Sequence, residues 1–318
     1  MHSICNRVAW PRFPEETCGV TADSSEKSTM RGVCYADCEQ RPTRGRVRET
    51  SPAHLTMNVT FEYDVDCKPR WWPEPHKQLY EILKRKRNLF QQHLQAFAAC
   101  AGHFCDIPFE STTLTGPFWR NGFFGGPDAI ALHGMMASVR PRLYFEIGSG
   151  NSTKFARNAI RTHELSTRLV SLDPKPRAEV DSLCDDVIRE PLENVDIAIF
   201  DRLEAGDILF YDGSHQVLSN SDVTVFFLEV LPRLRSGVWV HVHDVFLPWD
   251  YPPQWTDRYY AEEYVLACWI LADSPRIQIE LANYFISQHP ELMAELRPVY
   301  SLLPGLQDHG GSFWFQMR

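Results

Sequence analysis

Residues 143–156 read LYFEIGSGNSTKFA, an apolar run that leads into a turn containing two glycines. The first three residues, 143–145, are apolar and aromatic-rich, which is typical of a buried parallel strand. Gly148 and Gly150 permit a tight turn and a close approach of another backbone. Residues 151–153 (Asn-Ser-Thr) are good helix N-caps, and a helical pattern follows them. The stretch therefore predicts a strand, a turn and a helix N-terminus, the arrangement at which α/β proteins bind nucleotide-like ligands.

Beyond Pro141, strand-like and helical segments alternate, as expected for a mostly parallel sheet with helices on both faces. The expected strands are 143–147, 169–173, 185–189, 207–212, 237–245, 277–286 and 312–317, and the clearest helices are 219–234 and 258–273. A link of about thirty residues, rich in proline and glycine and with little helical pattern, joins the last two strands. Such a link suits an antiparallel strand at the sheet edge. We therefore predict a Rossmann-like, doubly wound α/β fold.

The chain before this region divides into two parts. Residues 1–58 are rich in charge, Ser, Thr and Arg without sustained periodicity, which predicts a flexible or irregular extension. Residues 59–127 contain a helical pattern and then a Gly/Pro-rich aromatic loop, which together predict a helical cap or lid. We expect the aromatic segment 117–124 to cover an acceptor site, and core packing of its rings is the alternative. A second helix is expected from Asp128, as its cap, at the start of the domain 128–318.

Composition excludes some functions and disfavours others. The net charge of −9 would repel a phosphate backbone, so nucleic acid is not an expected partner. The N-terminus lacks the apolar segment of a signal peptide, and the apolar run 264–272 is too short to span a bilayer. We therefore expect a cytoplasmic protein without a membrane partner, and assembly into a homo-oligomer stays open. Cys34 and Cys38 lack a second close pair, which argues against a zinc site.

Three residues distinguish between the nucleotide-like ligands. Thr153 stands where a dinucleotide fingerprint needs its third glycine. Glu146, at the end of the first strand, can accept a hydrogen bond from an amino group but would repel a pyrophosphate. Asp173 ends the second strand, where a carboxylate can hold a ribose diol. An amine and a ribose without a phosphate indicate S-adenosylmethionine (SAM) rather than a nicotinamide dinucleotide.

Four segments, FEIGSGNSTKFA, SLDPKP, ILFYDGSH and LRSGVWVHVHDVFLP, resemble the successive motifs of class I SAM-dependent methyltransferases. They are most similar to the subgroup with EIGSG-ST, DGSH and HD motifs, and the resemblance runs from about residue 120 to the C-terminus. It implies that 128–318 is a SAM-binding domain with a seven-stranded sheet whose last strand is antiparallel. The cofactor-binding residues that it implies are Glu146, Gly148, Ser149, Gly150, Asn151, Ser152, Asp173 and Asp212.

A hydroxyl acceptor must lose its proton to a base or be made more acidic by a metal. The motif YDGSH supplies Asp212 and His215, and VHVHDV supplies His241, His243 and Asp244. Side chains alternate along a strand, but at its end His243 and Asp244 can both converge on Asp212. We expect His241 to be a core histidine.

The arrangement resembles the magnesium-dependent macrolide-sugar O-methyltransferases. That resemblance implies metal ligands at Asp212, His243 and Asp244 and a general base at His215. The pattern has a carboxylate where this chain has His243. This difference leaves open a softer ion than magnesium (manganese, iron or zinc), or no metal and His243 as a second base.

The sequence thus predicts a SAM-dependent methyltransferase that O-methylates a small molecule with a histidine base, with a divalent metal left open. One alternative is a SAM-binding protein of this fold with a scaffold role or non-methyl-transfer chemistry. The other is an NAD-dependent oxidoreductase, against which the missing third glycine counts.

Overall fold

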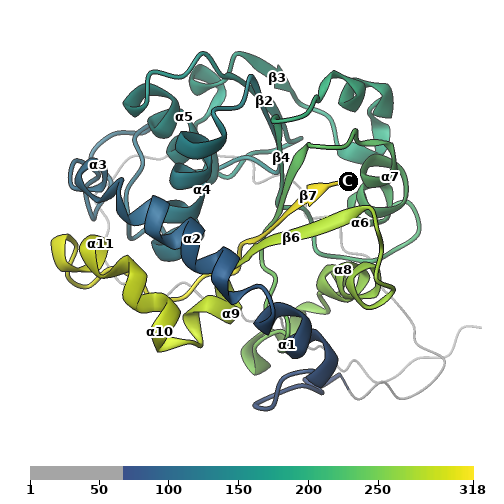
Figure 1. Cartoon of the computed structure of the whole chain (residues 1–318). Coiled ribbons are helices and arrows are strands. Elements are labelled where there is room, and N and C mark those ends of the chain that lie inside the picture. Colours follow the sequence, from purple (N-terminus) through teal and green to yellow (C-terminus); the bar gives the residue numbers. More distant parts are fainter. Residues whose placement is uncertain (1–66) are drawn as a thin grey trace, which may run out of the picture. The chain divides into compact units, whose positions relative to one another are not determined.

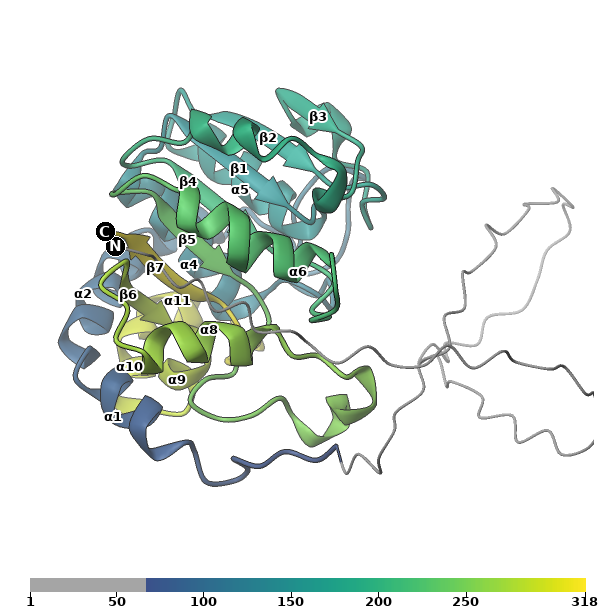
Figure 2. The ribbon, with the colours of Figure 1, turned by 90° about the vertical axis from the view of Figure 1, so that its right-hand side faces the viewer.

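The computed structural model describes residues 67–318, so the extension predicted at 1–58 and its cysteines lie outside the described residues. Seven strands form one sheet in the order β3-β2-β1-β4-β5-β7-β6 (Figures 1 and 2). They are β1 Leu143–Ile147, β2 Arg168–Leu172, β3 Asp186–Ile188, β4 Ile208–Tyr211, β5 Trp239–Val242, β6 Ile277–Ala282 and β7 Phe313–Met317. Strands β1 to β5 pair in parallel, and β7 is antiparallel to both of its neighbours. The predicted doubly wound sheet with an antiparallel last strand is confirmed.

The last strand does not lie at the sheet edge, contrary to the expectation from its link. β7 lies between β5 and β6, and β6 is the edge strand. The side chains of Phe313, Trp314 and Phe315 are all buried, as befits an internal strand with both faces covered, whereas β6 begins with two half-buried residues. The strand expected over 277–286 ends at Ala282, because α9 begins at Asn283. The link also contains short helices, namely α9 Asn283–Ser287, α10 Pro290–Met293 and α11 Arg297–Leu302.

Helices cover both faces of the sheet. Those before the link are α1 Lys77–Lys84, α2 Arg87–Ala98, α3 Ala101–Phe104, α4 Gly126–Val139, α5 Asn151–Thr162, α6 Asp222–Val225, α7 Leu231–Arg233 and α8 Glu262–Leu271. A π-helical turn at Phe226–Val230 joins α6 to α7, which confirms the helix expected over 219–234. Figure 2 shows α6 and α8 on the near face of the sheet, with α4 and α5 behind it. Helix α2, from the predicted cap segment, packs against α4 and β6.

Asp128 does not cap its helix, because α4 already begins at Gly126. Its buried carboxylate instead accepts hydrogen bonds from the backbone N–H groups of Gly311 and Ser312, each at 2.9 Å. The side-chain amide of Asn283 donates a third bond at 2.7 Å. Asp128 therefore connects the start of α4 to the segments that begin β7 and α9. Its Oδ2 atom also lies 3.3 Å from Nε2 of His243, at the end of β5.

Two further features of residues 67–318 bear on the expectations from composition. The cysteines within this range, Cys67, Cys100, Cys105, Cys184 and Cys268, are all free thiols. None of the helices over the same range combines the length and the apolar character needed to cross a lipid bilayer.

Candidate active site

The glycine turn after β1 lies directly against the end of β4. Gly148 has a φ of 79°, in the left-handed region that favours glycine. A Cβ atom added to it would lie 1.7 Å from the carbonyl oxygen of Asp212. The backbone N–H of Asp212 donates to the carbonyl of Ile147 at 2.9 Å, so the two chain segments touch along their backbones. Gly148 is therefore required by the contact between two strand ends, whether or not a ligand is bound.

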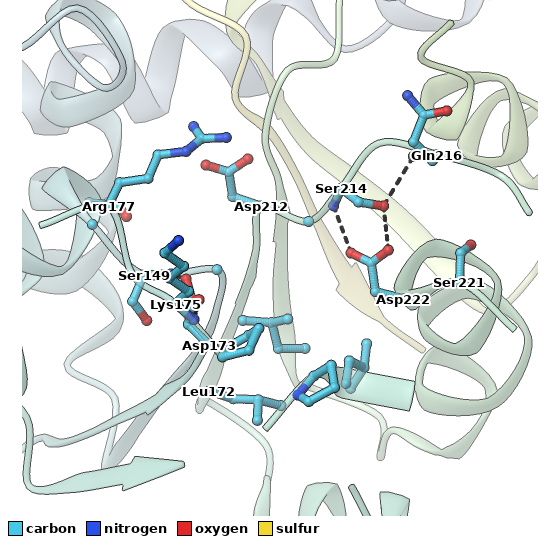
Figure 3. Close-up of a pocket in the computed structure, with 18 of the residues that line it drawn as sticks. Ser149, Leu172, Asp173, Lys175, Arg177, Asp212, Ser214, Gln216, Ser221 and Asp222 are labelled. Carbon is cyan, nitrogen blue, oxygen red and sulfur yellow. Dashed lines mark hydrogen bonds between the residues drawn. The ribbon is translucent and has the colours of Figure 1, made fainter. Parts of the chain in front are cut away.

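A cavity of about 530 Å³ opens beside this turn, at the carboxyl ends of β1, β2 and β4 (Figure 3). The predicted cofactor residues that line it are Gly148, Ser149, Gly150, Asn151, Ser152, Asp173 and Asp212. The loop after β4 and the start of α6 complete the wall, where Asp222 accepts hydrogen bonds from the backbone and the hydroxyl of Ser214. The parallel strands thus bring together residues that are far apart in the sequence.

Asp173 fastens two of these loops to each other. One carboxylate oxygen accepts the backbone N–H of Ser149, and the other accepts that of Lys175, both at 2.7 Å. Each carboxylate oxygen can accept a further bond. The carboxylate therefore retains capacity for a diol in the cavity that it lines. Its ribose role stays a prediction.

Glu146 is fully buried and does not belong to the cavity wall. Its Oε2 atom accepts the hydroxyl of Thr153 at 2.5 Å, and the same hydroxyl oxygen accepts the N–H of Gly150 at 3.0 Å. Thr153, the residue in place of a third glycine, thus links Glu146 to the turn. The other oxygen, Oε1, has no hydrogen-bond partner among residues 67–318. Burial, chiefly, raises the pKa of Glu146 to about 8, with the charges of Asp212 and Asp173 acting in the same direction.

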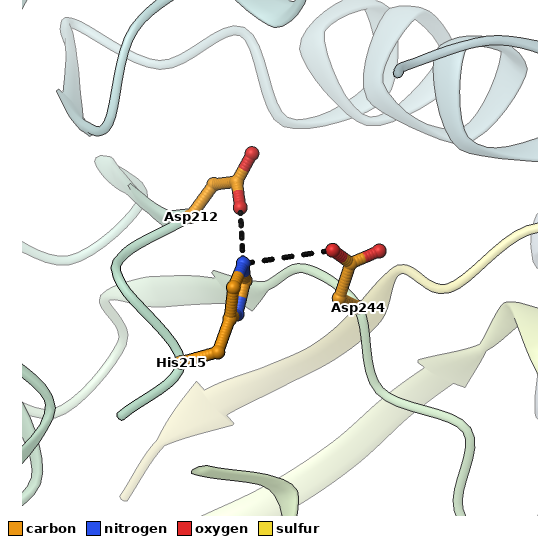
Figure 4. Close-up of side chains that lie close together, drawn as sticks. All are labelled: Asp212, His215 and Asp244. Atoms are coloured by element: carbon orange, nitrogen blue, oxygen red, sulfur yellow. Dashed lines mark ion pairs between the residues drawn. The ribbon is translucent and has the colours of Figure 1, made fainter. Parts of the chain in front are cut away.

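Asp212, His215 and Asp244 converge beside the cavity (Figure 4). The Nε2 atom of His215 lies 3.4 Å from Oδ1 of Asp212 and 3.5 Å from Oδ2 of Asp244. One potential metal-ligating atom from each residue lies within 4.8 Å of the others. The resemblance implied His243 as the third ligand with Asp212 and Asp244. The structure instead groups His215 with the two carboxylates.

His215 is held from its other side by a carboxylate that the sequence analysis did not identify. Its Nδ1 lies 2.6 Å from Oε1 of Glu262, a fully buried residue in the first turn of α8. Burial alone would lower the pKa of His215, but Glu262, Asp212 and Asp244 outweigh it and raise the pKa to about 9. The imidazole is therefore protonated at neutral pH unless another cation takes the place of the proton.

His243 lies on the opposite side of the same two carboxylates. Its Nδ1 is 3.4 Å from Oδ1 of Asp244 and 3.7 Å from Oδ2 of Asp212, and its Nε2 is 3.3 Å from Oδ2 of Asp128. Burial opposes the charged form, but these carboxylates raise the pKa of His243 to about 10. His241, two residues earlier, is buried, stacks on Phe210 with ring centroids 3.9 Å apart and bonds Ser312 through Nε2 at 2.8 Å. The expectation of a core histidine at 241 is confirmed.

Left-handed backbone conformations aim two of these side chains. His215 has a φ of 63° and Asp244 a φ of 55°, values that are uncommon for residues other than glycine. Such conformations cluster at functional sites, where the surrounding contacts hold them. The turn at Asp244 ends the alternation of β5 and lets His243 and Asp244 both face Asp212, as the relaxation at a strand end predicted.

Glu262 and Asp128 are the site residues that the sequence analysis missed. Asp128 was interpreted as a helix cap, and Glu262 fell inside an expected helix without a role of its own. A signal was available for Glu262. It is one of two consecutive glutamates that begin α8, whose later buried residues are apolar, so a buried carboxylate there needs a partner.

The aromatic loop before α4 contains both packed and exposed rings. Trp119 and Phe124 are buried, and the Phe124 ring contacts Phe155 and Phe210 with centroids 6.0 and 5.8 Å apart. Phe123 is 63% exposed, with the guanidinium of Arg177 5.4 Å from its ring centroid. Both phenylalanines line the cavity. Core packing therefore accounts for Trp119 and Phe124, and Phe123 is the ring free to cover a ligand.

Replacing Gly148 with alanine should lower the melting temperature as well as ligand affinity, because Cβ would collide with the carbonyl oxygen of Asp212. We expect a loss of about 1–3 kcal/mol in unfolding free energy, the range typical of overpacking. Gly150→Ala is the matched control, since a Cβ there meets no atom within 4 Å. Urea denaturation of both variants measures the difference. Equal stability of Gly148→Ala and wild type would contradict the contact.

The two neighbouring phenylalanines should respond differently to alanine substitution. Phe124→Ala empties a buried site between α5 and β4 and should cost about 3–5 kcal/mol of unfolding free energy. Phe123→Ala removes an exposed ring and should change stability by about 0.5 kcal/mol or less. Thermal and urea denaturation provide the measurement. A similar loss in both variants would show that Phe123 also packs in the core.

One family model matches the part of the chain that contains the glycine turn. Residues 145–245, less than half of the chain, match a family model described as a methyltransferase domain. No curated protein sequence matches the chain significantly.

Three solved structures illustrate the distant likenesses. A methyltransferase of Podospora anserina with bound SAH is 16% identical over 60% of this chain and 77% of its own, with a TM-score of 0.36. An O-methyltransferase from Bacillus cereus in complex with SAH is 16% identical over 76% and 95%, with a TM-score of 0.35. A branched-chain polyamine synthase from Thermus thermophilus is 11% identical over 70% and 63%, with a TM-score of 0.37.

At these low similarities the solved structures say nothing about the reaction. The family match carries more weight, because it runs from β1 to the residue after Asp244. It includes the glycine turn and all three members of the Asp212–His215–Asp244 group. The part of the chain that is similar to methyltransferase domains is thus the part that forms the cavity and the cluster beside it.

Proposed function

We propose that this chain is a SAM-dependent methyltransferase that methylates a hydroxyl group of a small molecule. The observation that carries the proposal is the sharing of Asp212 between the cavity and the imidazole–carboxylate group. A ligand in the cavity would have its reactive end beside groups that can remove or acidify a proton. The match of residues 145–245 to a methyltransferase domain supports the methyl-transfer part of the proposal.

The residues around the cavity fit SAM. A cavity of about 530 Å³ lies within the range of roughly 300–1,000 Å³ usual for small-molecule sites. Gly148 and Gly150 present bare backbone to it, and Ser149, Asn151 and Ser152 surround the N-terminus of α5, which favours a carboxylate. The unpartnered Oε1 of Glu146, although outside the cavity wall, would be the acceptor for an amino group, and Asp173 would hold the ribose. When bound, SAM supplies a methyl group on a sulfonium.

The acceptor hydroxyl must lose a proton, and two routes are open to this cluster. In the first, Nε2 of His215 takes the proton, with Glu262 holding Nδ1 as the carboxylate of a catalytic triad holds its histidine. In the second, a divalent metal makes the hydroxyl more acidic. Both routes use the same lone pair of His215 if that residue is a metal ligand, so they exclude one another. His243 is as buried as His215 and also faces Asp212 and Asp244, so it stays the second candidate for the base.

SAM binding should release a proton if its amino group reaches Glu146. In the ligand-free protein the pKa of Glu146 is about 8, so the carboxyl is protonated at pH 6–7.5. Pairing with an ammonium lowers this pKa, and affinity should therefore rise with pH until about 8. Calorimetry in buffers of different ionisation enthalpy counts the protons. We expect about one per SAM, with NAD giving no binding signal.

Glu146→Gln should abolish that proton release and weaken SAM binding by about 1–2 kcal/mol, the value of a charge-assisted hydrogen bond. Glu193→Gln is the control. Glu193 lines the cavity, so this substitution removes one negative charge nearby and leaves the glycine turn after β1 unchanged. Proton release that persists in Glu146→Gln would remove Glu146 from the ligand site and leave it a structural partner of Thr153.

If His215 is the base, methyl transfer should depend on its deprotonation. The rate, measured as kcat/KM on a panel of small-molecule hydroxyl compounds with chelator present, should rise about tenfold per pH unit towards pH 9. His215→Ala should lose kcat while still binding SAM. Turnover that requires added metal, with no such pH dependence, would exclude the first route. SAM binding without transfer of its methyl group to any hydroxyl compound would contradict the proposed reaction.

A further inference from the structure

The spacing of the Asp212–His215–Asp244 group is that of metal ligands rather than of hydrogen-bonded side chains. The distances from Nε2 of His215 to the two carboxylates are 3.4 and 3.5 Å. Charge-assisted hydrogen bonds are shorter, at about 2.7–2.9 Å. Ligands about 2.1 Å from a tetrahedral ion lie about 3.4 Å apart along each edge of the tetrahedron. The two distances from His215 therefore match that spacing, and one ligand atom from each of the three residues lies within 4.8 Å of the others.

The orientation of His215 leads to the same conclusion. Metal-ligating histidines usually give their second ring nitrogen to a carboxylate, which sets the tautomer and the ring direction. Glu262 does this at 2.6 Å from Nδ1, and its carboxylate is fully buried. Nε2 is consequently turned towards Asp212 and Asp244 (Figure 4). A buried carboxylate is costly, so its presence behind this ring indicates that the ring direction matters.

An independent observation comes from the other side of the two aspartates. His243 is 4% exposed, and its Nδ1 has no hydrogen-bond partner within residues 67–318. This atom is aimed at the same carboxylates, 3.4 Å from Asp244 and 3.7 Å from Asp212, with Asp128 holding the far side of the ring. Buried polar atoms are nearly always hydrogen-bonded, so the unpaired Nδ1 of His243 indicates that a ligand belongs beside Asp212 and Asp244 or that the side chains rearrange when one binds.

The group is also accessible to an ion. The side chains of Asp212 and Asp244 are 26% and 21% exposed, and Asp212 lines the cavity. Three protein ligands leave coordination positions open, as in catalytic rather than structural metal sites. An ion held here would therefore face the same space as the proposed cofactor and acceptor.

The donor set selects among ions. Magnesium and calcium prefer all-oxygen ligands, whereas imidazole suits zinc, iron and similar transition metals, and carboxylates suit manganese as well. We propose that Asp212, His215 and Asp244 bind a divalent first-row transition ion, such as zinc, manganese or iron, with Nε2 of His215 as a ligand. Glu262 is the positioning residue for that ligand. The ion would make the acceptor hydroxyl more acidic, which is the second of the two routes given above. Its catalytic purpose therefore rests on the proposed function. Ion binding itself requires neither SAM nor an acceptor.

The test is metal binding by the full chain after treatment with chelator, measured by calorimetry and by metal content after dialysis. We expect one Zn²⁺ or Mn²⁺ per chain and at least tenfold weaker binding of Mg²⁺. His215→Ala and Asp212→Asn should each lose the site. The absorption spectrum of the Co²⁺-loaded protein should show imidazole ligation, which His215→Ala abolishes.

A neighbouring pair of variants isolates the positioning role of Glu262. Glu262→Gln should weaken ion affinity 10- to 100-fold at unchanged stoichiometry, the usual effect of losing a carboxylate behind a histidine ligand. Glu263→Gln is the matched control. Glu263 is equally buried on the same helix, but it accepts the backbone N–H of Phe246 at 2.8 Å instead of a histidine. Its substitution should leave ion affinity unchanged. If Glu262→Gln fails to fold, the Co²⁺ spectra of wild type and His215→Ala still decide.

Three outcomes would overturn the proposal. They are the absence of stoichiometric binding, Mg²⁺ binding as tight as that of Zn²⁺, and undiminished binding by His215→Ala. Undiminished binding with loss in His243→Ala would restore the ligand set that the resemblance implied. Methyl transfer that continues without a metal would leave the proposed function standing and remove only the metal. Stoichiometric ion binding by a chain that does not bind SAM would support the metal site and contradict the proposed function.

Discussion

The contact between Gly148 and the carbonyl of Asp212 holds the two halves of the site together. It joins the turn after β1, which leads into α5, to the end of β4, which leads to Asp212 and His215. Because the backbones touch, the glycine turn lies at a fixed place beside the imidazole–carboxylate group. Any side chain at position 148 would separate them. The cavity and the cluster are thus parts of one site.

Negative charge dominates that site, and the protein balances it by different means. Asp128 is buried, but bonds from His243, Asn283 and Gly311 outweigh the effect of burial and hold its pKa at about 2. For Glu146 the effect of burial exceeds that of its hydroxyl donors such as Thr153, and its pKa is raised to about 8. Asp212 and Asp244 rely on His215 and His243, whose pKa values they raise. A region built in this way attracts cations. The sulfonium of SAM and a divalent ion are both cations, so one electrostatic design would serve the two.

The same architecture supports several chemistries, so the reaction must be argued from the site. The turn here has a threonine in place of the third glycine of a dinucleotide fingerprint, and that threonine bonds the buried carboxylate of Glu146. The neighbouring imidazole, with a buried carboxylate behind it, is the group to which we assign the proposed proton or metal chemistry. Neither feature follows from the order of the strands. Both depend on side chains at strand ends, which vary freely among proteins of this fold.

The local features of this protein are determined by its sequence. The strand, turn and helix of residues 143–156, the carboxylates at the ends of β1, β2 and β4, and the burial of His241 all follow from apolar periodicity and turn chemistry, which act over a few residues. The tertiary structure decided the rest. Asp128 bonds Gly311 rather than its own helix, β7 lies inside the sheet, and Glu262 rather than a nearby residue holds His215. Each depends on a partner more than 30 residues away, brought into contact only when the sheet is complete. A local pattern shows that a carboxylate must be satisfied, but only the packed chain shows by what.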